Sequence, residues 1–112
     1  MNKTMIVLML CAGALTSPAM GADPAALAKS KHCFTCHDPK SEMIGPSFTD
    51  IARRFKGVSD AKAMLARVIQ AGSDAPGVAY HWGATKMPPA SARVAVSKEE
   101  AEVLAEYVLS FK

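Results

Sequence analysis

Hydrophobic residues recur at helical spacing in several stretches of the chain, and the segments between them are rich in Gly and Pro. The broadest apolar stripe lies in residues 97–112, where hydrophobic positions three and four apart share one face: Ala101, Leu104, Tyr107, Val108 and Phe111. A second stripe lies in residues 59–72 and consists of Ala61, Leu65, Val68 and Ile69. No stretch shows a convincing strand pattern. The pattern therefore predicts an all-α fold.

Capping signals mark where the first and last helices begin. Asp23 stands directly before Pro24, and an acidic N-cap followed by Pro at the first helical position is a typical helix start. The helix that begins there is expected to run up to the cysteines of residues 31–40. Ser97 and Glu100 have the spacing of a capping box, so the last helix is expected to begin after Ser97.

Two further helices are expected in the middle of the chain. Residues 48–57 predict a short helix that ends near Gly57, and the next helix is expected to run from a cap at Ser59 or Asp60 to Gly72. Residues 72–96 then form the longest irregular segment. A loop of this length is long for a small domain, and such loops usually have a function.

The N-terminal residues are typical of a secretory signal peptide. Lys3 precedes an apolar run over residues 5–15, and polar and small residues follow it. We expect residues 1–21 to be removed and residues 22–112 to form a single domain. Because a membrane-spanning helix needs roughly 18 to 20 apolar residues, the run is too short for a stable membrane anchor.

Charge and composition argue against a nucleic-acid partner and indicate that the interior holds a group other than protein side chains. The formal net charge of +3 falls to +2 when Lys3 is removed, and no basic cluster alternates with aromatic residues. Nucleic-acid binding is therefore not expected. A domain of this size is marginal on its own core, and its helical stripes lack enough apolar partners, so we expect a further group in its middle.

The segment "KHCFTCHDPK", residues 31–40, holds Cys33, Cys36 and His37 in a C-x-x-C-H pattern. A thioredoxin-like dithiol usually follows a strand in a βαβ unit, which this chain lacks. A structural zinc site needs four ligands, and no second ligand pair is present. C-x-x-C-H is also the attachment signature of a c-type haem, in which two thiols bind the two vinyl groups and the histidine ligates the iron. Export and the all-α pattern favour this third interpretation.

A second axial ligand to the iron has several candidates: Met43, Met64, His81 and Met87. Met64 lies within a predicted helix, where core packing is its expected role. Met43 lies close to the attachment motif and is expected to pack there. Met87 stands in "KMPP", where two prolines stiffen the backbone, and it is the favoured ligand. His81 remains an alternative, and ligation by two histidines would lower the reduction potential.

The mature chain resembles the class I cytochromes c, specifically the small bacterial cytochrome c-551 (cytochrome c8) type. The resemblance covers residues 22–112 and depends on "DPAALAKSKHCFTCH", "MIGPSFTDIARRF", "WGATKMPP" and "EAEVLAEYVLS". It implies a small cytochrome c fold, with about four short helices wrapped around one covalently bound haem c. It also implies thioether links at Cys33 and Cys36, and axial ligation by His37 and Met87.

The resemblance further implies how the haem pocket is built. The Pro46 carbonyl would accept a hydrogen bond from His37, and the Trp82 indole N–H would point to a haem propionate. The residues expected in the pocket are Met43, Ile44, Pro46, Phe55, Leu65, Ile69, Trp82 and Pro88.

The chain departs from this type in two places. The loop that contains Tyr80 and His81 is longer than usual. Where an Asn often hydrogen-bonds the ligand methionine, this chain has Ala90 and Ser91. We therefore expect Met87 to be less constrained.

These features predict a soluble, monomeric, monohaem electron carrier in the periplasm of a Gram-negative bacterium, and not an enzyme. Its expected partners are a membrane cytochrome complex, a periplasmic reductase or a terminal oxidase, docking transiently at the haem edge. Lys29, Lys31 and Lys86 are candidates for a basic docking rim. The alternatives are a small haem peroxidase or gas-binding sensor in which Met87 detaches, or a cytochrome subunit of a larger oxidoreductase.

Overall fold

The computed structural model describes residues 13, 23–78 and 82–112. The predicted signal peptide lies outside them except for Gly13, and so do Tyr80 and His81. The described residues form four α-helices and two single-turn 3₁₀ helices, with no strand among them. The predicted all-α class is confirmed.

The first and last helices begin at the predicted caps. Helix α1 spans Pro24–Ser30, and the Asp23 side chain accepts a hydrogen bond of 3.1 Å from the backbone N–H of Ala25. Helix α4 spans Lys98–Leu109 and has a complete capping box. Ser97 Oγ accepts from the Glu100 N–H at 3.1 Å, and the Glu100 carboxylate accepts from the Ser97 N–H at 2.8 Å. Both starts therefore follow from local sequence, because each cap satisfies free backbone N–H groups of the first turn.

The two middle helices also occur where they were predicted. Helix α2 spans Phe48–Arg54, and Ser47 caps it by accepting from the Asp50 N–H at 3.0 Å. Helix α3 spans Ala61–Ala71 after Asp60 and ends at Gly72, whose φ of +93° favours glycine.

The two 3₁₀ helices were not predicted. Helix η1 spans Cys33–Thr35 within the cysteine motif, and η2 spans Ala90–Ala92 within the long irregular segment. A single turn is too short to show hydrophobic periodicity, so sequence patterns give no signal for it.

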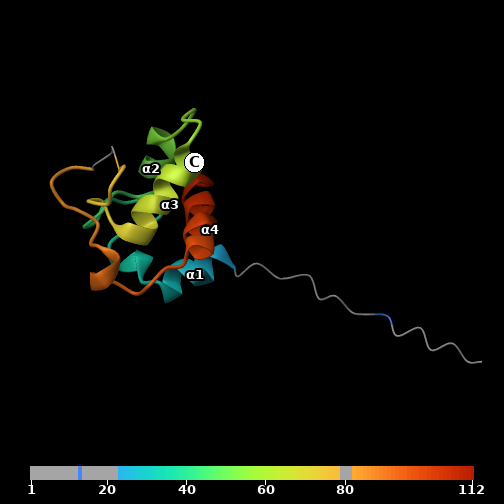
Figure 1. The fold of residues 1–112 in the computed structure, drawn as a ribbon. Coiled ribbons are helices and arrows are strands. Elements are labelled where there is room, and N and C mark those ends of the chain that lie inside the picture. The colour runs from blue at the N-terminus through green and yellow to red at the C-terminus, as the bar shows by residue number, and fades with distance from the viewer. Residues whose placement is uncertain (1–12, 14–22, 79–81) are drawn as a thin grey trace, which may run out of the picture.

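Helix α4 is the central element of the packing. It lies along α3 and contacts α1 and α2, as Figure 1 shows. Ala28 of α1 and Ala101 and Ala105 of α4 are at most 1% exposed, and such small side chains let helices approach closely. Leu104 and Val108 continue the buried face of α4.

An aromatic cluster around Phe48 joins α2 to α4 and to the cysteine motif. The Phe48 ring centroid lies 5.8 Å from that of Phe34, 5.4 Å from Phe111 and 6.0 Å from Tyr107. It also stacks on His37, with the ring centroids 5.6 Å apart. Phe48 is 3% exposed, so this cluster forms a rigid support beneath the His37 ring.

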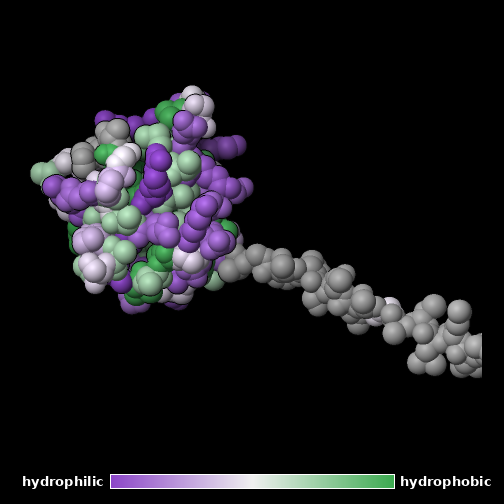
Figure 2. All heavy atoms as spheres, viewed as in Figure 1, coloured by the Kyte–Doolittle hydropathy of each residue, from purple (hydrophilic) through white to green (hydrophobic). Residues whose placement is uncertain are grey.

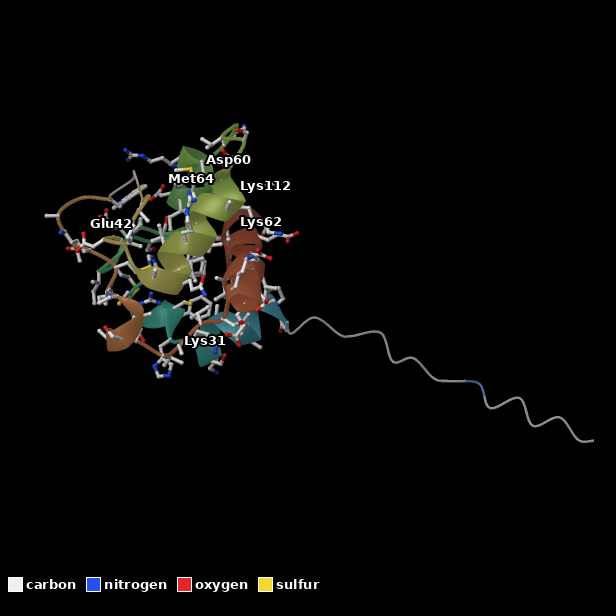
Figure 3. All side chains as sticks on the ribbon, in the orientation of Figure 1. Lys31, Glu42, Asp60, Lys62, Met64 and Lys112 are labelled. Carbon is white, nitrogen blue, oxygen red and sulfur yellow. The ribbon has the colours of Figure 1, made fainter. Side chains whose placement is uncertain are left out.

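Polar side chains cover most of the face drawn in Figure 2, with small hydrophobic patches between them. On this surface Lys62 of α3 and Glu106 of α4 form an ion pair of 3.2 Å, and Lys62 is labelled in Figure 3. Within the described residues, no helix has the length and the apolar character that a bilayer crossing requires.

Candidate functional site

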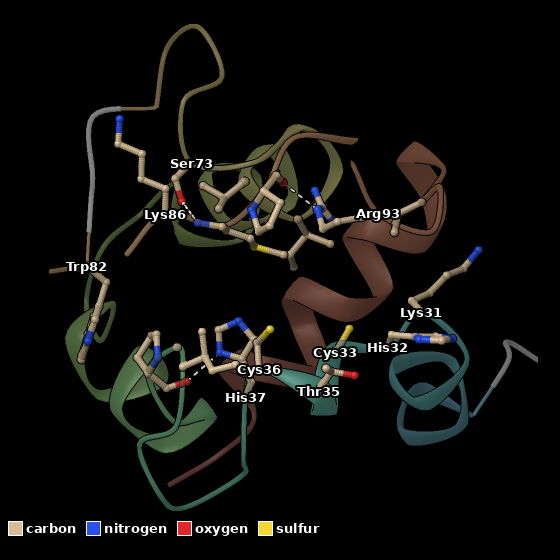
Figure 4. Close-up of a pocket in the computed structure, with 18 of the residues that line it drawn as sticks. Lys31, His32, Cys33, Thr35, Cys36, His37, Ser73, Trp82, Lys86 and Arg93 are labelled. Carbon is tan, nitrogen blue, oxygen red and sulfur yellow. Dashed lines mark hydrogen bonds between the residues drawn. The ribbon is translucent and has the colours of Figure 1, made fainter. Parts of the chain in front are cut away.

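A cavity of about 810 Å³ lies between the cysteine motif and the loop that follows α3. Its volume is within the range of cofactor sites. Figure 4 shows Cys33, Cys36 and His37 on one side of the cavity, with Ser73 and Arg93 on the other. Trp82 lies at one end and Lys31 at the opposite end. The cavity thus separates two sets of residues that come from distant parts of the chain.

Helix η1 places the two cysteines of the motif in the cavity wall. Cys33 and Cys36 are free thiols, both half-buried, and the Cys36 and His37 N–H groups donate to the Cys33 carbonyl at 3.2 and 3.0 Å. His32 begins this turn with a φ of +62°, a left-handed conformation that non-glycine residues seldom adopt. The turn brings both thiols and the imidazole to one wall.

His37 is fixed by a hydrogen bond and by burial. Its Nδ1 lies 2.7 Å from the Pro46 carbonyl oxygen. Burial lowers the pKa of His37, and the Pro46 carbonyl opposes this shift. In the neutral tautomer with the proton on Nδ1, this hydrogen bond leaves the lone pair on Nε2 for a metal ion.

Gly45 packs directly against the His37 ring. A Cβ at residue 45 would lie 2.6 Å from His37 Cε1 and 3.0 Å from Nδ1, closer than side chains tolerate. The Gly45 N–H also donates to the Cys36 carbonyl at 2.8 Å. The loop can therefore reach the imidazole only because residue 45 has no side chain.

Met87 lies in the opposite wall, and Ser73 holds its backbone from both sides. The Met87 N–H donates to Ser73 Oγ at 2.9 Å, and the Met87 carbonyl accepts from the Ser73 N–H at 3.1 Å. The backbone of Gly72 also packs tightly against this segment, because a Cβ at residue 72 would lie 2.6 Å from the Pro88 carbonyl oxygen. The backbone of Met87 is thus fixed, while the expected looseness of its thioether stays a prediction.

Arg93 forms another part of this wall. Its Nε donates to the Pro88 carbonyl at 2.7 Å, and its Nη2 is buried without a hydrogen-bond partner. Burial lowers the pKa of Arg93 and raises that of the Cys33 thiol, and the attraction between the two charges opposes both shifts. Arg93 and Cys33 therefore face the same cavity from opposite walls.

Most of the residues expected in the pocket line this cavity: Ile44, Pro46, Phe55, Leu65, Ile69, Trp82 and Pro88. Met43 does not, and it is 51% exposed at the surface. Met64 is also outside the lining and packs against the hydrophobic core from α3, where Figure 3 labels it. Trp82 carries the Arg54 guanidinium over its ring, with 5.0 Å from Cζ to the centroid.

Comparison with known proteins identifies the family. The family model described as cytochrome c matches residues 22–112. The chain is 42% identical to cytochrome c-551 of Stutzerimonas stutzeri over the full length of both proteins. It is 43% identical to cytochrome c-551 of Pseudomonas aeruginosa over 88% of this chain and 86% of that protein. The chain belongs to the cytochrome c family. The crystal structure of Nitrosomonas europaea cytochrome c552 is similar to this cytochrome c fold, with a TM-score of 0.66 and 36% identity over 79% of this chain and 99% of that one.

Members of the cytochrome c family carry a covalently attached haem c, and the geometry of the cavity fits one. Two free thiols and an imidazole share one wall, as a C-x-x-C-H attachment site requires. The remaining wall is mostly apolar. The buried Nη2 of Arg93 has no protein partner, which is expected where a ligand completes the surroundings of a guanidinium. Cys33 and Cys36 would hold this haem covalently.

Sequence reasoning missed Gly45, Gly72, Ser73 and Arg93 as parts of the site. Gly72 was interpreted only as the end of a helix, Gly45 was given no role, and neither Ser73 nor Arg93 belongs to a motif. Of the lysines proposed as a docking rim, Lys31 pairs with Glu100 at 2.9 Å and Lys86 with Asp74 at 3.0 Å. These two charges are therefore partly neutralised by neighbouring carboxylates.

Proposed function

We propose that this protein is a small monohaem electron carrier of the bacterial periplasm, in which His37 and Met87 are the axial ligands of the haem iron. The observation that supports this most strongly is the cavity with Cys33, Cys36 and His37 on one wall and Met87 on the other. When bound, the haem supplies a one-electron couple between Fe(II) and Fe(III). The protein is then an electron-transfer protein and not an enzyme, because both axial positions are filled from within the chain.

The residues around the two ligands hold them in one geometry. Pro46 orients the His37 ring through its carbonyl, and this hydrogen bond makes Nε2 a more basic ligand. On the other side Ser73 fixes the Met87 backbone through two hydrogen bonds. Ligands that stay in place during oxidation and reduction require little rearrangement, which favours rapid electron exchange.

The apolar wall excludes water and favours the reduced state. Phe55 and Leu65 are buried at 7% and 8% exposure, and both line the cavity. An apolar surrounding disfavours the additional positive charge of Fe(III), and a thioether ligand has the same effect, so both raise the reduction potential. The Trp82 indole N–H is proposed to donate to a haem propionate at its end of the cavity.

An exposed apolar patch, formed by Met43 and Ile44, suits a transient partner. These side chains are 51% and 62% exposed, and Ile44 also lines the cavity, so the patch lies at the cavity mouth. A membrane cytochrome complex, a periplasmic reductase or a terminal oxidase is the proposed kind of partner. A small patch without a strong charge field supports short-lived docking of a monomer.

Absorption spectra of the oxidised and reduced haem protein test this proposal. We expect a low-spin spectrum and a methionine-to-iron charge-transfer band in the oxidised protein, and we expect Met87→Ala to lose that band. We also expect no carbon monoxide binding to the reduced protein at neutral pH. Rapid carbon monoxide binding by the unsubstituted protein would indicate a peroxidase or gas sensor and contradict the carrier.

A further inference from the structure

The Arg93 side chain extends from the segment after η2 back to the cavity. It lines the cavity, its Nε donates to Pro88 at 2.7 Å, and its Nη2 is buried with no hydrogen-bond partner. The Ser73 and Arg93 hydrogen bonds together fasten two successive residues, Met87 and Pro88. The Nε contact is thus an anchor of this segment in addition to the two hydrogen bonds between Met87 and Ser73.

We propose that Arg93 is a positioning residue for the axial methionine: its Nε–H holds the Met87–Pro88 segment against the cavity, and its guanidinium places a fixed positive charge in the cavity wall. This inference rests on the proposed ligation by Met87. It concerns a residue outside the attachment motif and outside the Met-Pro-Pro segment.

Three physical arguments support this role. A hydrogen bond from a charged donor is stronger than one from a neutral donor, and a carbonyl fixed at residue 88 restricts the residue before it. A buried N–H of a guanidinium requires a partner, and an aromatic ring system such as a porphyrin is a surface on which guanidinium groups stack. A positive charge beside the cavity repels the additional positive charge of Fe(III), so it opposes oxidation of the iron.

The proposal predicts two separable effects in the haem-loaded protein. Arg93→Met keeps an apolar stem but removes the donor and the charge. We expect imidazole to displace Met87 from the oxidised iron about tenfold more readily, because one charge-assisted hydrogen bond is lost. We also expect the reduction potential to fall. Arg93→Lys keeps a charge, so its potential is expected to stay near that of the unsubstituted protein.

Arg67→Met is the matched control, because Arg67 is exposed on α3, does not line the cavity and carries the same charge. Imidazole binding is followed by the loss of the methionine-to-iron band, and the potential is measured by redox titration. If Arg93→Met binds imidazole as weakly as Arg67→Met, the positioning role is wrong. If both variants have the same potential, the role of the local charge is wrong.

A replacement variant and the methionine-to-iron band of the unsubstituted protein allow every outcome to be interpreted. If Arg93→Met yields no folded haem protein, Arg93→Gln replaces it, because this variant also removes the charge and keeps a polar side chain. If the unsubstituted protein lacks the methionine-to-iron band, the proposed ligation by Met87 has failed. If the band is present and the Arg93 variants match the control, only the inference about Arg93 has failed.

Discussion

Gly45 determines how closely the loop after the cysteine motif approaches the proximal imidazole. The position of a Cβ at this residue lies 2.6 Å from His37 Cε1, and the next residue supplies the carbonyl that His37 Nδ1 contacts at 2.7 Å. A side chain at residue 45 would therefore press on the ring and on its hydrogen bond at the same time. The absence of a side chain here is part of the ligand geometry.

We expect Gly45→Ala to lower the free energy of unfolding of the haem protein by about 1 to 3 kcal/mol, the usual cost of overpacking. Displacement of the ring weakens its hydrogen bond to Pro46. A less basic imidazole stabilises Fe(III) less, so the reduction potential is expected to rise. Denaturant titration and redox titration measure the two effects.

Gly57→Ala provides the control for this substitution. Gly57 has a φ of +80°, and nothing lies within 4 Å of the position of its Cβ, so an alanine there strains only the backbone. It should lower stability without changing the potential. If the two variants have the same potential, contact with residue 45 does not influence the proximal ligand.

At the residue scale, the sequence identified groups whose chemistry is local. Cys33, Cys36 and His37 occur as one motif, and Met87 is marked by the prolines after it. Gly45 and Ser73 were not identified, because their roles depend on which segments meet in space. A glycine that ends a helix and one that makes room for a ring look alike in a sequence.

At the scale of elements, the first turn of α4 also forms a contact with the end of α1. Glu100 closes the capping box on Ser97 and forms an ion pair with Lys31 at 2.9 Å. Lys31 also donates to the Ala95 carbonyl at 2.9 Å, so this corner connects the C-terminal end of α1 to the segment that leads into α4. The hydrogen bond from the Ser97 N–H lowers the pKa of Glu100, and the hydrogen bond from Lys31 adds to this shift.

This lowered pKa predicts how the contribution of Glu100 depends on pH. A carboxyl group whose pKa is lower in the folded state than its ordinary value of 4.5 stabilises the fold above that pH, and the contribution disappears as the pH falls through the folded-state pKa. We expect Glu100→Gln to lower the urea midpoint at about pH 7 and to match the unsubstituted protein well below pH 4.5. Glutamine keeps a polar group at this capping position, so the comparison isolates the charge.

Glu102→Gln removes the same charge from an exposed position on α4. Its effect on the midpoint should be smaller than that of Glu100→Gln at neutral pH. An equal loss in both variants would mean that net charge, and not the contacts of Glu100, causes the change.

The starts of the helices could be predicted from the sequence, whereas the paths of the connecting segments could not. Asp23, Ser97 and Glu100 act within one turn of their own helix, so their spacing in the sequence is enough to predict the caps. The path of the described residues of this segment, 72–78 and 82–96, depends instead on contacts around the cavity, such as that of Arg93 with Pro88. Only the irregularity of this segment could be predicted, together with its functional importance.

At the scale of the whole molecule, the cavity is large relative to the protein core beside it. Six of the thirteen buried hydrophobic residues in the described part of the chain are alanines, while the cavity beside them measures about 810 Å³. The apolar walls of this cavity would face water in a chain without haem, which is unfavourable for a domain whose total stability is typically about 5 to 15 kcal/mol.

The domain should therefore depend on its haem for folding. We expect a variant with both Cys33→Ser and Cys36→Ser to be colourless and to lose most of the helical signal in far-ultraviolet circular dichroism, because its apolar walls would face water. Met87→Ala serves as the control: it keeps both thioether links and removes one proposed ligand, so it should stay coloured and helical with a lower unfolding midpoint. A colourless variant that unfolds cooperatively from a native helix content would show that the helices alone suffice to form the core.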